Sequence, residues 1–216
     1  MIKAVLFDMD GLMFDTERMY HDSWLELGRQ RGLAMTEALV AGMRGRNREG
    51  CVALCKAAFG PEFDFMELRG ACVERMEAQI AAKGLPKRPG LDELLEELAR
   101  RDLPAVLATS TGRATALRYL ELARVNRYFK GAVCGDEVEH GKPAPDIFLR
   151  AAALAGAAPG QCMVLEDSPN GLRAGAAAGC RAVMVPDLDP ATPELAALAA
   201  AVVPSLREAI PLLDTL

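Results

Sequence analysis

Residues 4–11 read AVLFDMDG: four apolar residues, then two aspartates that flank a methionine, and a glycine. A short apolar run that ends at polar turn residues is typical of a buried strand in a parallel sheet. If the chain leaves this strand still extended, Asp8 and Asp10 point to the same side. The stretch therefore predicts a strand over Ala4–Phe7 that presents two carboxylates at its end. An ordinary acidic turn is the alternative, and DxDG alone leaves it open.

Four later stretches repeat this pattern, with helical segments between them. The apolar runs are Ala105–Ala108 before Thr109, Ala132–Cys134 before Gly135, Met163–Leu165 before Glu166, and Ala182–Val185 before Pro186. Helices are predicted over Gly90–Arg101, Thr115–Ala123, Pro145–Ala155 and Asn170–Ala178. Strands that alternate with helices predict an α/β fold with a doubly wound parallel sheet.

The connection after the first strand departs from this alternation. The next clear strand begins near Ala105, whereas ordinary connections between a strand and a helix run about 2–6 residues. The helices predicted in between span Arg18–Arg31, Arg48–Phe59 and Phe65–Lys83. We therefore expect a core formed by residues 1–13 and 86–216, with residues 14–85 inserted as a separate helical unit.

Composition limits the classes of partner. The 216 residues carry a net charge of −5, which argues against a general surface for nucleic acid or anionic membranes. The six cysteines form no CxxC pair and the chain has two histidines, which disfavours a zinc site and favours reduced core cysteines. No apolar run of about 18 residues occurs, and the N-terminus does not resemble a signal peptide. We expect a cytoplasmic protein without a nucleic-acid, membrane or obligate protein partner.

The polar clusters that follow the strands are expected to meet, because ligands of open parallel sheets bind outside the carboxyl ends of the strands. Carboxylate pairs repel each other, and Mg²⁺, which prefers oxygen ligands, relieves the repulsion. One carboxylate can attack phosphorus while its partner transfers protons, and hydroxyls and a lysine can hold the phosphoryl group. The residues gathered in this way are Asp8, Asp10, Thr109, Ser110, Thr111, Lys142, Glu166 and Asp167.

Each cluster also has an ordinary structural explanation. The hydroxyls of Thr109–Thr111 could cap the following helix, and so could Asp167 or Ser168 in the last cluster. Lys142 could be a solvated loop lysine. The occurrence of all clusters in order, each in its place after a strand, favours the chemical interpretation.

Four segments resemble the motifs of the haloacid dehalogenase superfamily, in order and at the expected spacing. The resemblance covers essentially the whole chain and is closest to the β-phosphoglucomutase-like and sugar-phosphatase-like branch. It implies a Rossmann-like catalytic core with an inserted α-helical cap. The segments are FDMDGLMFDTE at residues 7–17, LATST at 107–111, GKPAPDIF at 141–148 and LEDSPNG at 165–171.

The resemblance also implies a role for each residue. Asp8 would be the nucleophile, and Asp10 the general acid and base. Thr109 and the loop after it would bind the transferring phosphoryl group, and Lys142 would stabilise its charge. The implied magnesium ligands are Asp8, Asp10 through its backbone carbonyl, Glu166 and Asp167.

The family resemblance leaves more than one reaction open. The second aspartate, Asp10, together with Glu166 and Asp167, favours chemistry on phosphate monoesters. Haloacid dehalogenases proper need no second aspartate and no metal. The mutase carries a histidine in the first cap helix where this chain has Tyr20, which favours a phosphatase acting on a small phosphorylated metabolite such as a sugar phosphate. A β-phosphoglucomutase-like isomerase is the alternative, followed by a non-enzymatic regulatory protein.

Two residues of the insertion match the substrate-recognition loop of the family. They are Gly45 and Arg48, in a segment with three arginines that would suit an anionic substrate. The alternative is an ordinary loop followed by a solvated helix start.

Overall fold

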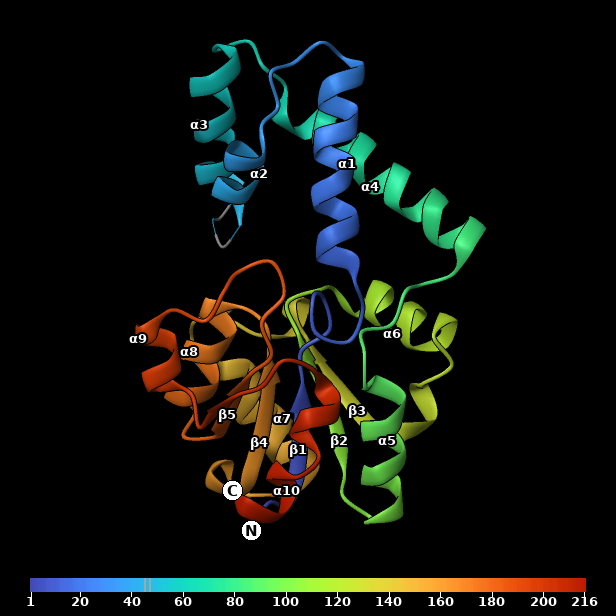
Figure 1. Ribbon diagram of the computed structural model, residues 1–216, viewed down its shortest axis with the longest axis vertical. Coiled ribbons are helices and arrows are strands. Elements are labelled where there is room, and N and C mark those ends of the chain that lie inside the picture. Colours follow the sequence, from blue (N-terminus) through green and yellow to red (C-terminus); the bar gives the residue numbers. More distant parts are fainter. Residues whose placement is uncertain (45, 47) are drawn as a thin grey trace. The chain divides into compact units, whose positions relative to one another are not determined.

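The computed structural model describes residues 1–44, 46 and 48–216. Over these residues the chain divides into two compact units, one formed by Met1–Asp15 with Leu85–Leu216 and the other by Thr16–Gly84. Figure 1 shows both, and each is described by itself. That the helical unit acts as a cap stays a prediction.

The larger unit is built on a parallel sheet. Within the described residues the sheet has six strands in the order β3-β2-β1-β4-β5-β6, so the predicted doubly wound α/β fold is confirmed. The sequence does not predict the last strand, because its two residues lie in an alanine-rich run that favours a helix. The strands are β1 (Ala4–Phe7), β2 (Ala105–Thr109), β3 (Phe129–Cys134), β4 (Cys162–Glu166), β5 (Arg181–Met184) and β6 (Ala201–Val202).

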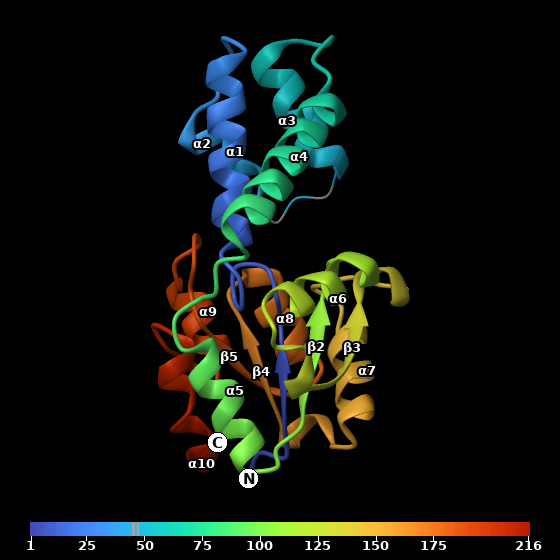
Figure 2. The ribbon, with the colours of Figure 1, turned by 90° about the vertical axis from the view of Figure 1, so that its right-hand side faces the viewer.

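Helices cover both faces of this sheet, as Figure 2 shows, with α5 and α6 on one face and α7 and α8 on the other. Leu6 of β1 and Val164 of β4 belong to the same buried cluster as Phe148 of α7 and Leu172 of α8. Burial on both faces explains why the strands have continuous apolar runs. The helices of this unit are α5 (Leu91–Arg100), α6 (Arg113–Leu122), α7 (Asp146–Ala155), α8 (Pro169–Ala177), α9 (Pro193–Leu198) and α10 (Leu212–Thr215).

The strand order reverses between β1 and β4. From β1 the chain builds β2 and β3 to one side and then returns to β4 on the other side of β1. Phe7 pairs with Leu165 in this register, so Asp8 and Glu166 follow side by side at the carboxyl ends of the two strands. Ligands of open α/β sheets bind at such a switch point.

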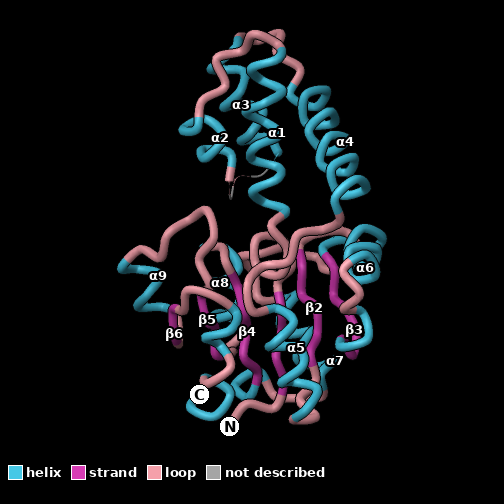
Figure 3. The backbone as a smooth tube through the Cα atoms, turned by 45° about the vertical axis from the view of Figure 1, so that its right-hand side comes forward, coloured by secondary structure: helices cyan, strands magenta, loops and turns pink. Residues whose placement is uncertain are grey.

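The second unit consists of helices and the loops between them in its described part, as Figure 3 shows. Its buried core contains Trp24, whose ring stacks on Phe65 with centroids 5.3 Å apart, and the free cysteines Cys51, Cys55 and Cys72. The sequence does not predict α2, because seven residues are too few to show a helical period. The helices are α1 (Thr16–Gln30), α2 (Glu37–Met43), α3 (Arg48–Phe59) and α4 (Phe65–Lys83). None of the described helices of either unit combines the length and apolarity needed to cross a bilayer.

The two connections that lead to and from the helical unit run side by side within the larger unit. Phe14 and Lys87 form an antiparallel bridge, and the Arg88 N–H donates to the Met13 carbonyl oxygen at 2.9 Å. The Arg88 guanidinium is paired with the buried carboxylate of Asp187, with N and O atoms 2.7 Å apart. The same group lies 3.5 Å from the Asp15 carboxylate, so one side chain ties both connections to the loop after β5.

Candidate active site

Two carboxylates lie at the switch point of the sheet. Asp8 follows β1, and its backbone N–H donates to the Leu165 carbonyl oxygen at 3.1 Å, which continues the pairing of the strands. Glu166 is the last residue of β4. Asp8 is 7% exposed and Glu166 is 1% exposed. Buried carboxylates require charged or hydrogen-bonding partners, because burial of an uncompensated charge is costly.

The Lys142 ammonium joins these two carboxylates. Its Nζ donates to Asp8 Oδ1 at 2.5 Å, to Glu166 Oε1 at 2.6 Å and to the Ala108 carbonyl oxygen at 3.0 Å. An ammonium group has three N–H donors, so these acceptors use its full capacity. Its side chain is 6% exposed, which shows that the solvated-lysine alternative is wrong. Nζ also lies 4.9 Å from the centroid of the Phe148 ring on α7.

The charges of this bridge shift the pKa of both partners. Burial works to lower the pKa of Lys142, but the carboxylates of Asp8 and Glu166 raise it above its usual value. Burial raises the pKa of Asp8 to about 8, and Lys142 opposes this shift while Glu166 and Asp10 add to it. Lys142 therefore stays protonated, and additional positive charge near Asp8 would favour its ionised form.

The start of α8 holds the second oxygen of Glu166. Glu166 Oε2 accepts hydrogen bonds from the Ser168 backbone N–H at 3.0 Å and from the Ser168 hydroxyl at 2.9 Å. Ser168 is also the N-cap of the helix, since its Oγ accepts from the Gly171 N–H at 3.0 Å. The alternative that Ser168 caps the helix is confirmed, and the same hydroxyl fixes Glu166.

Gly171 leaves the space that Glu166 occupies, since a Cβ at this position would lie 1.7 Å from Glu166 Oε1. We expect Gly171→Ala to lower the free energy of unfolding by about 2 kcal/mol through overpacking. Urea denaturation would measure the loss. The matched control is Gly70→Ala in α4, where an added Cβ meets no described atom within 4 Å. The control is expected to gain up to about 1 kcal/mol. Equal losses in the two variants would contradict this packing argument.

Asp167 adds a third buried carboxylate, at 8% exposure. Among the described residues, Asp8, Glu166 and Asp167 each place a carboxylate oxygen within 4.8 Å of the other two. Lys142 offers one positive charge against these three acids. Oxygen ligands and excess negative charge are the features that suit a magnesium ion.

The Asp10 carboxylate is engaged by the loop after β2. Its Oδ2 accepts a hydrogen bond from Thr111 Oγ1 at 2.6 Å. The Thr111 N–H in turn donates to Thr109 Oγ1 at 3.1 Å, and Thr109 is buried. Ser110, between them, is exposed. The structure therefore brings Asp10, Thr109 and Thr111 together and leaves the Ser110 side chain at the surface.

The helix-cap alternative for these hydroxyls is wrong. The backbone N–H of Arg113, the first residue of α6, donates to the Asp136 carboxylate at 3.1 Å, and no side-chain hydroxyl caps the described start of the helix.

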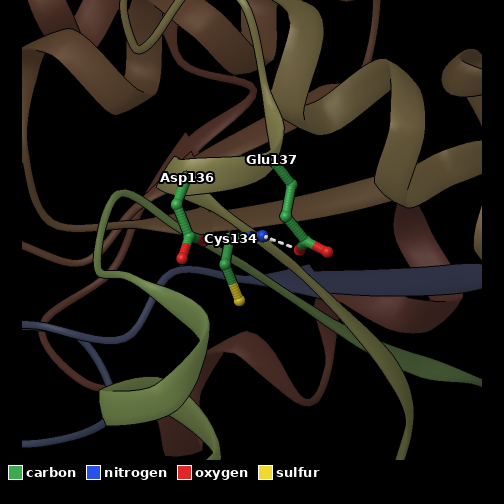
Figure 4. Close-up of side chains that lie close together, drawn as sticks. All are labelled: Cys134, Asp136 and Glu137. Carbon is green, nitrogen blue, oxygen red and sulfur yellow. Dashed lines mark hydrogen bonds between the residues drawn. The ribbon is translucent and has the colours of Figure 1, made fainter.

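Asp136 belongs to a second acidic group, which serves local structure. Figure 4 shows the side chains of Cys134, Asp136 and Glu137 close together. Their potential ligand atoms lie within 4.8 Å of one another. The Glu137 carboxylate accepts from the Cys134 N–H at 2.8 Å and closes the short 3-10 helix after β3, while Asp136 caps α6. Burial raises the pKa of the Cys134 thiol, which disfavours the thiolate that a metal would require. We assign these residues a capping role.

The predicted substrate residues lie in the helical unit. Arg48 is exposed and begins α3. Gly45 lies outside the described residues. Their role in substrate recognition stays a prediction.

Sequence reasoning missed two groups that hold the site together. Ala108 contributes its backbone carbonyl oxygen to Lys142, and side-chain identity carries no signal for such a contact. For Ser168 the sequence indicates only a possible helix cap. Its position two residues after a strand-end acid is the signal that could have indicated a bond to Glu166.

Comparisons with known proteins identify a family and several chains that are similar to this one. The haloacid dehalogenase-like hydrolase family matches residues 2–179. The phosphorylated carbohydrates phosphatase of Thermotoga maritima is 33% identical over 179 residues, covering 82% of this chain and 82% of that protein. The fructose-1-phosphate phosphatase YqaB of Escherichia coli is 31% identical over 188 residues, covering 84% and 95%. A HAD family hydrolase from Deinococcus radiodurans, solved with bound phosphate and sodium, has a TM-score of 0.79 at 28% identity, covering 96% and 93%.

Proposed function

The chain belongs to the haloacid dehalogenase-like hydrolases, and we propose that it is a magnesium-dependent phosphatase acting through an aspartyl-phosphate intermediate. The observation that carries this proposal is the buried bridge from Asp8 through Lys142 to Glu166. A carboxylate hydrogen-bonded to a fixed ammonium group, whose positive charge favours the ionised form, is suited to nucleophilic attack on phosphorus. The substrate would be a small phosphorylated metabolite such as a sugar phosphate, and the names of the two phosphatase relatives support this class.

The carboxylates beside this bridge fit a magnesium ion. Asp8, Glu166 and Asp167 would supply oxygen ligands, since their carboxylates lie within 4.8 Å of one another among the described residues. The backbone carbonyl of Asp10 would add a further oxygen. When bound, the ion supplies positive charge that offsets the charges of Asp8 and the phosphoryl group.

The residues of the site would divide the reaction between them. The Asp8 carboxylate attacks phosphorus as the bond to the leaving oxygen breaks, and protonated Asp10 gives its proton to that oxygen. Lys142 keeps its bond to Asp8 and offsets the charge that gathers on the transferring group. Thr109 Oγ1 accepts the Thr111 N–H and keeps its own hydrogen to donate to a phosphoryl oxygen. Water then attacks the aspartyl phosphate, gives a proton to Asp10, and releases phosphate and Asp8.

Removal of divalent cations is expected to reduce phosphate release to background, because the buried acids would then repel an anionic substrate. The measurement is inorganic phosphate released from a sugar phosphate with excess EDTA, and again after Mg²⁺ is added beyond the chelator. EDTA that has been saturated with Mg²⁺ beforehand is the control and should not inhibit. Full activity in excess free chelator would exclude the scheme.

A substrate panel tests the proposed reaction itself. Phosphate release from a set of sugar phosphates would be measured beside interconversion of β-glucose 1-phosphate and glucose 6-phosphate. We expect hydrolysis to dominate. Mutase turnover without comparable phosphate release would overturn the proposal in favour of an isomerase, and inactivity on the whole panel would favour a binding protein on the same fold.

A further inference from the structure

The Thr111 hydroxyl donates to Asp10 at a distance typical of a strong hydrogen bond, 2.6 Å between Oγ1 and Oδ2. We propose that Thr111 is a positioning residue that holds the carboxyl group of Asp10 in one orientation for proton transfer. The inference rests on the proposed function and adds to it a role for the loop after β2. It replaces the phosphate-binding role that the sequence pattern suggests for Thr111.

The hydrogen-bonding capacity of a hydroxyl separates Thr111 from Thr109. A threonine hydroxyl has a single O–H to donate. Thr111 gives its hydrogen to Asp10 and cannot give it to a phosphoryl oxygen at the same time. Thr109 Oγ1 accepts the Thr111 N–H through a lone pair, and its hydrogen stays available. The two hydroxyls of one loop would therefore serve the proton donor and the phosphoryl group separately.

The backbone around Thr111 fixes the position of its hydroxyl. Its N–H donates to Thr109 Oγ1 at 3.1 Å, and its carbonyl oxygen accepts from the Gly135 N–H at 3.2 Å. A Cβ on Gly135 would lie 2.1 Å from the Ser110 carbonyl oxygen, so the loops after β2 and β3 are in close backbone contact. Because the Thr111 backbone is held on both sides, its hydroxyl has a fixed position from which it can orient the Asp10 side chain.

The bond also favours one oxygen of Asp10 as the carrier of the proton. The carbonyl oxygen of a carboxylic acid is its better acceptor, so while Oδ2 accepts from Thr111 we expect the acid hydrogen on Oδ1. In the first step the Asp8 oxygen bonds to phosphorus, the ester P–O bond breaks, and this hydrogen passes to the departing oxygen. In the second step a water oxygen bonds to phosphorus, the bond to Asp8 breaks, and Oδ1 takes a proton from water. Loss of the Thr111 hydroxyl would leave Asp10 present but poorly oriented.

Leaving groups of different basicity make this role measurable. An alkoxide leaves only with a proton, so hydrolysis of a sugar phosphate or of glycerol phosphate depends on the acid. A nitrophenolate is a weaker base and leaves without a proton. Hydrolysis of 4-nitrophenyl phosphate therefore does not depend on the acid. The parameter to compare is kcat/KM, because it covers the steps up to the departure of the leaving group. Loss of an oriented acid is expected to lower kcat/KM for alkyl phosphates and to leave kcat/KM for 4-nitrophenyl phosphate nearly unchanged.

The test compares Thr111→Val, Thr111→Ser and the matched control Thr115→Val, a half-buried threonine in α6. We expect Thr111→Val to lose about 50-fold in kcat/KM on the alkyl phosphate and less than about 3-fold on 4-nitrophenyl phosphate. Thr111→Ser keeps the hydroxyl and should restore the alkyl rate to within about 3-fold. Thr115→Val should resemble the wild type on both substrates.

Each other outcome counts against the proposal. An equal loss on both substrates, or a serine variant as slow as the valine variant, would overturn the positioning role while wild-type hydrolysis upholds the proposed function. Near-wild-type activity of Thr111→Val on the alkyl phosphate would overturn it as well. If the wild type hydrolyses neither substrate, the proposed function is overturned, and this inference with it.

Discussion

Asp8→Asn is expected to lower kcat for phosphate release by about ten-thousand-fold, because the amide keeps the shape of the side chain but cannot form the aspartyl phosphate. The measurement is phosphate released from 4-nitrophenyl phosphate and from a sugar phosphate at saturating Mg²⁺. Asp102→Asn is the matched control. Asp102 is exposed and has a positive φ of 55°, a conformation that asparagine accepts well. Equal turnover by Asp8→Asn and wild type would exclude Asp8 as the nucleophile.

The same substitution is expected to leave the fold intact. Burial raises the pKa of Asp8 to about 8, so its ionised form is disfavoured in the folded protein without a metal. A neutral asparagine removes that disadvantage, and we expect the melting temperature of the metal-free protein to stay the same or rise. Sites that place like charges together commonly gain stability when the charge is removed. A large fall in melting temperature would contradict the inference that burial disfavours the ionised form of Asp8.

Lys142→Met is expected to damage both activity and stability. The apolar side chain fills similar space but leaves the buried carboxylates of Asp8 and Glu166 without the ammonium that joins them. Removing one partner of a buried ion pair costs about 3–5 kcal/mol, and removing a preorganised positive charge at the reacting group costs about 100- to 1000-fold in kcat. Urea denaturation and phosphate release would measure the two effects. Lys3→Met, at an exposed position, is the control and should change neither.

A double variant separates the two contributions of Lys142. Glu166→Gln in the Lys142→Met background removes one of the two facing charges, so part of the lost stability should return. Activity should not return, because the positive charge beside Asp8 is still missing. Recovery of turnover together with stability would show that Lys142 acts only through folding.

The opposite stability effects of Asp8→Asn and Lys142→Met follow from one geometric fact. Three clustered acids face one ammonium group, which contacts two of them, so removing an acid is expected to relieve repulsion and removing the base to increase it. A site built only for stability would not be expected to gather charge in this way.

The parts of the fold that the sequence predicts are those with a strong local signal. Strands β1, β2 and β4 are continuous apolar runs because helices bury both of their faces, and α3 and α4 span the predicted residues. The start of β3 is missed, since Phe129 and Gly131 are half-buried, Lys130 is exposed, and the three do not form an apolar run. The short elements α2 and β6 depend on contacts with their neighbours, which a pattern of two to seven residues cannot show.

The site was predictable as a set of residues but not as a set of contacts. Parallel strands bring Asp8, Thr109 and Glu166 to one edge, and that much follows from the order of strands and polar clusters. Whether a hydroxyl faces a phosphate or a neighbouring acid depends on loop geometry. The pairing of Thr111 with Asp10, across neighbouring strands, has no signature in the spacing of residues.

The paired connections at Phe14 and Lys87 also bear on how the protein could evolve. The chain leaves the sheet-containing unit and returns to it at adjacent backbone positions, joined by a bridge and by the bonds of Arg88. A short turn in place of residues 16–84 would therefore join ends that already lie together. Insertions are tolerated where chain ends meet in this way, so recombination could exchange one helical module for another without shifting any strand. The helical unit and the sheet-containing unit could then change in separate genetic events.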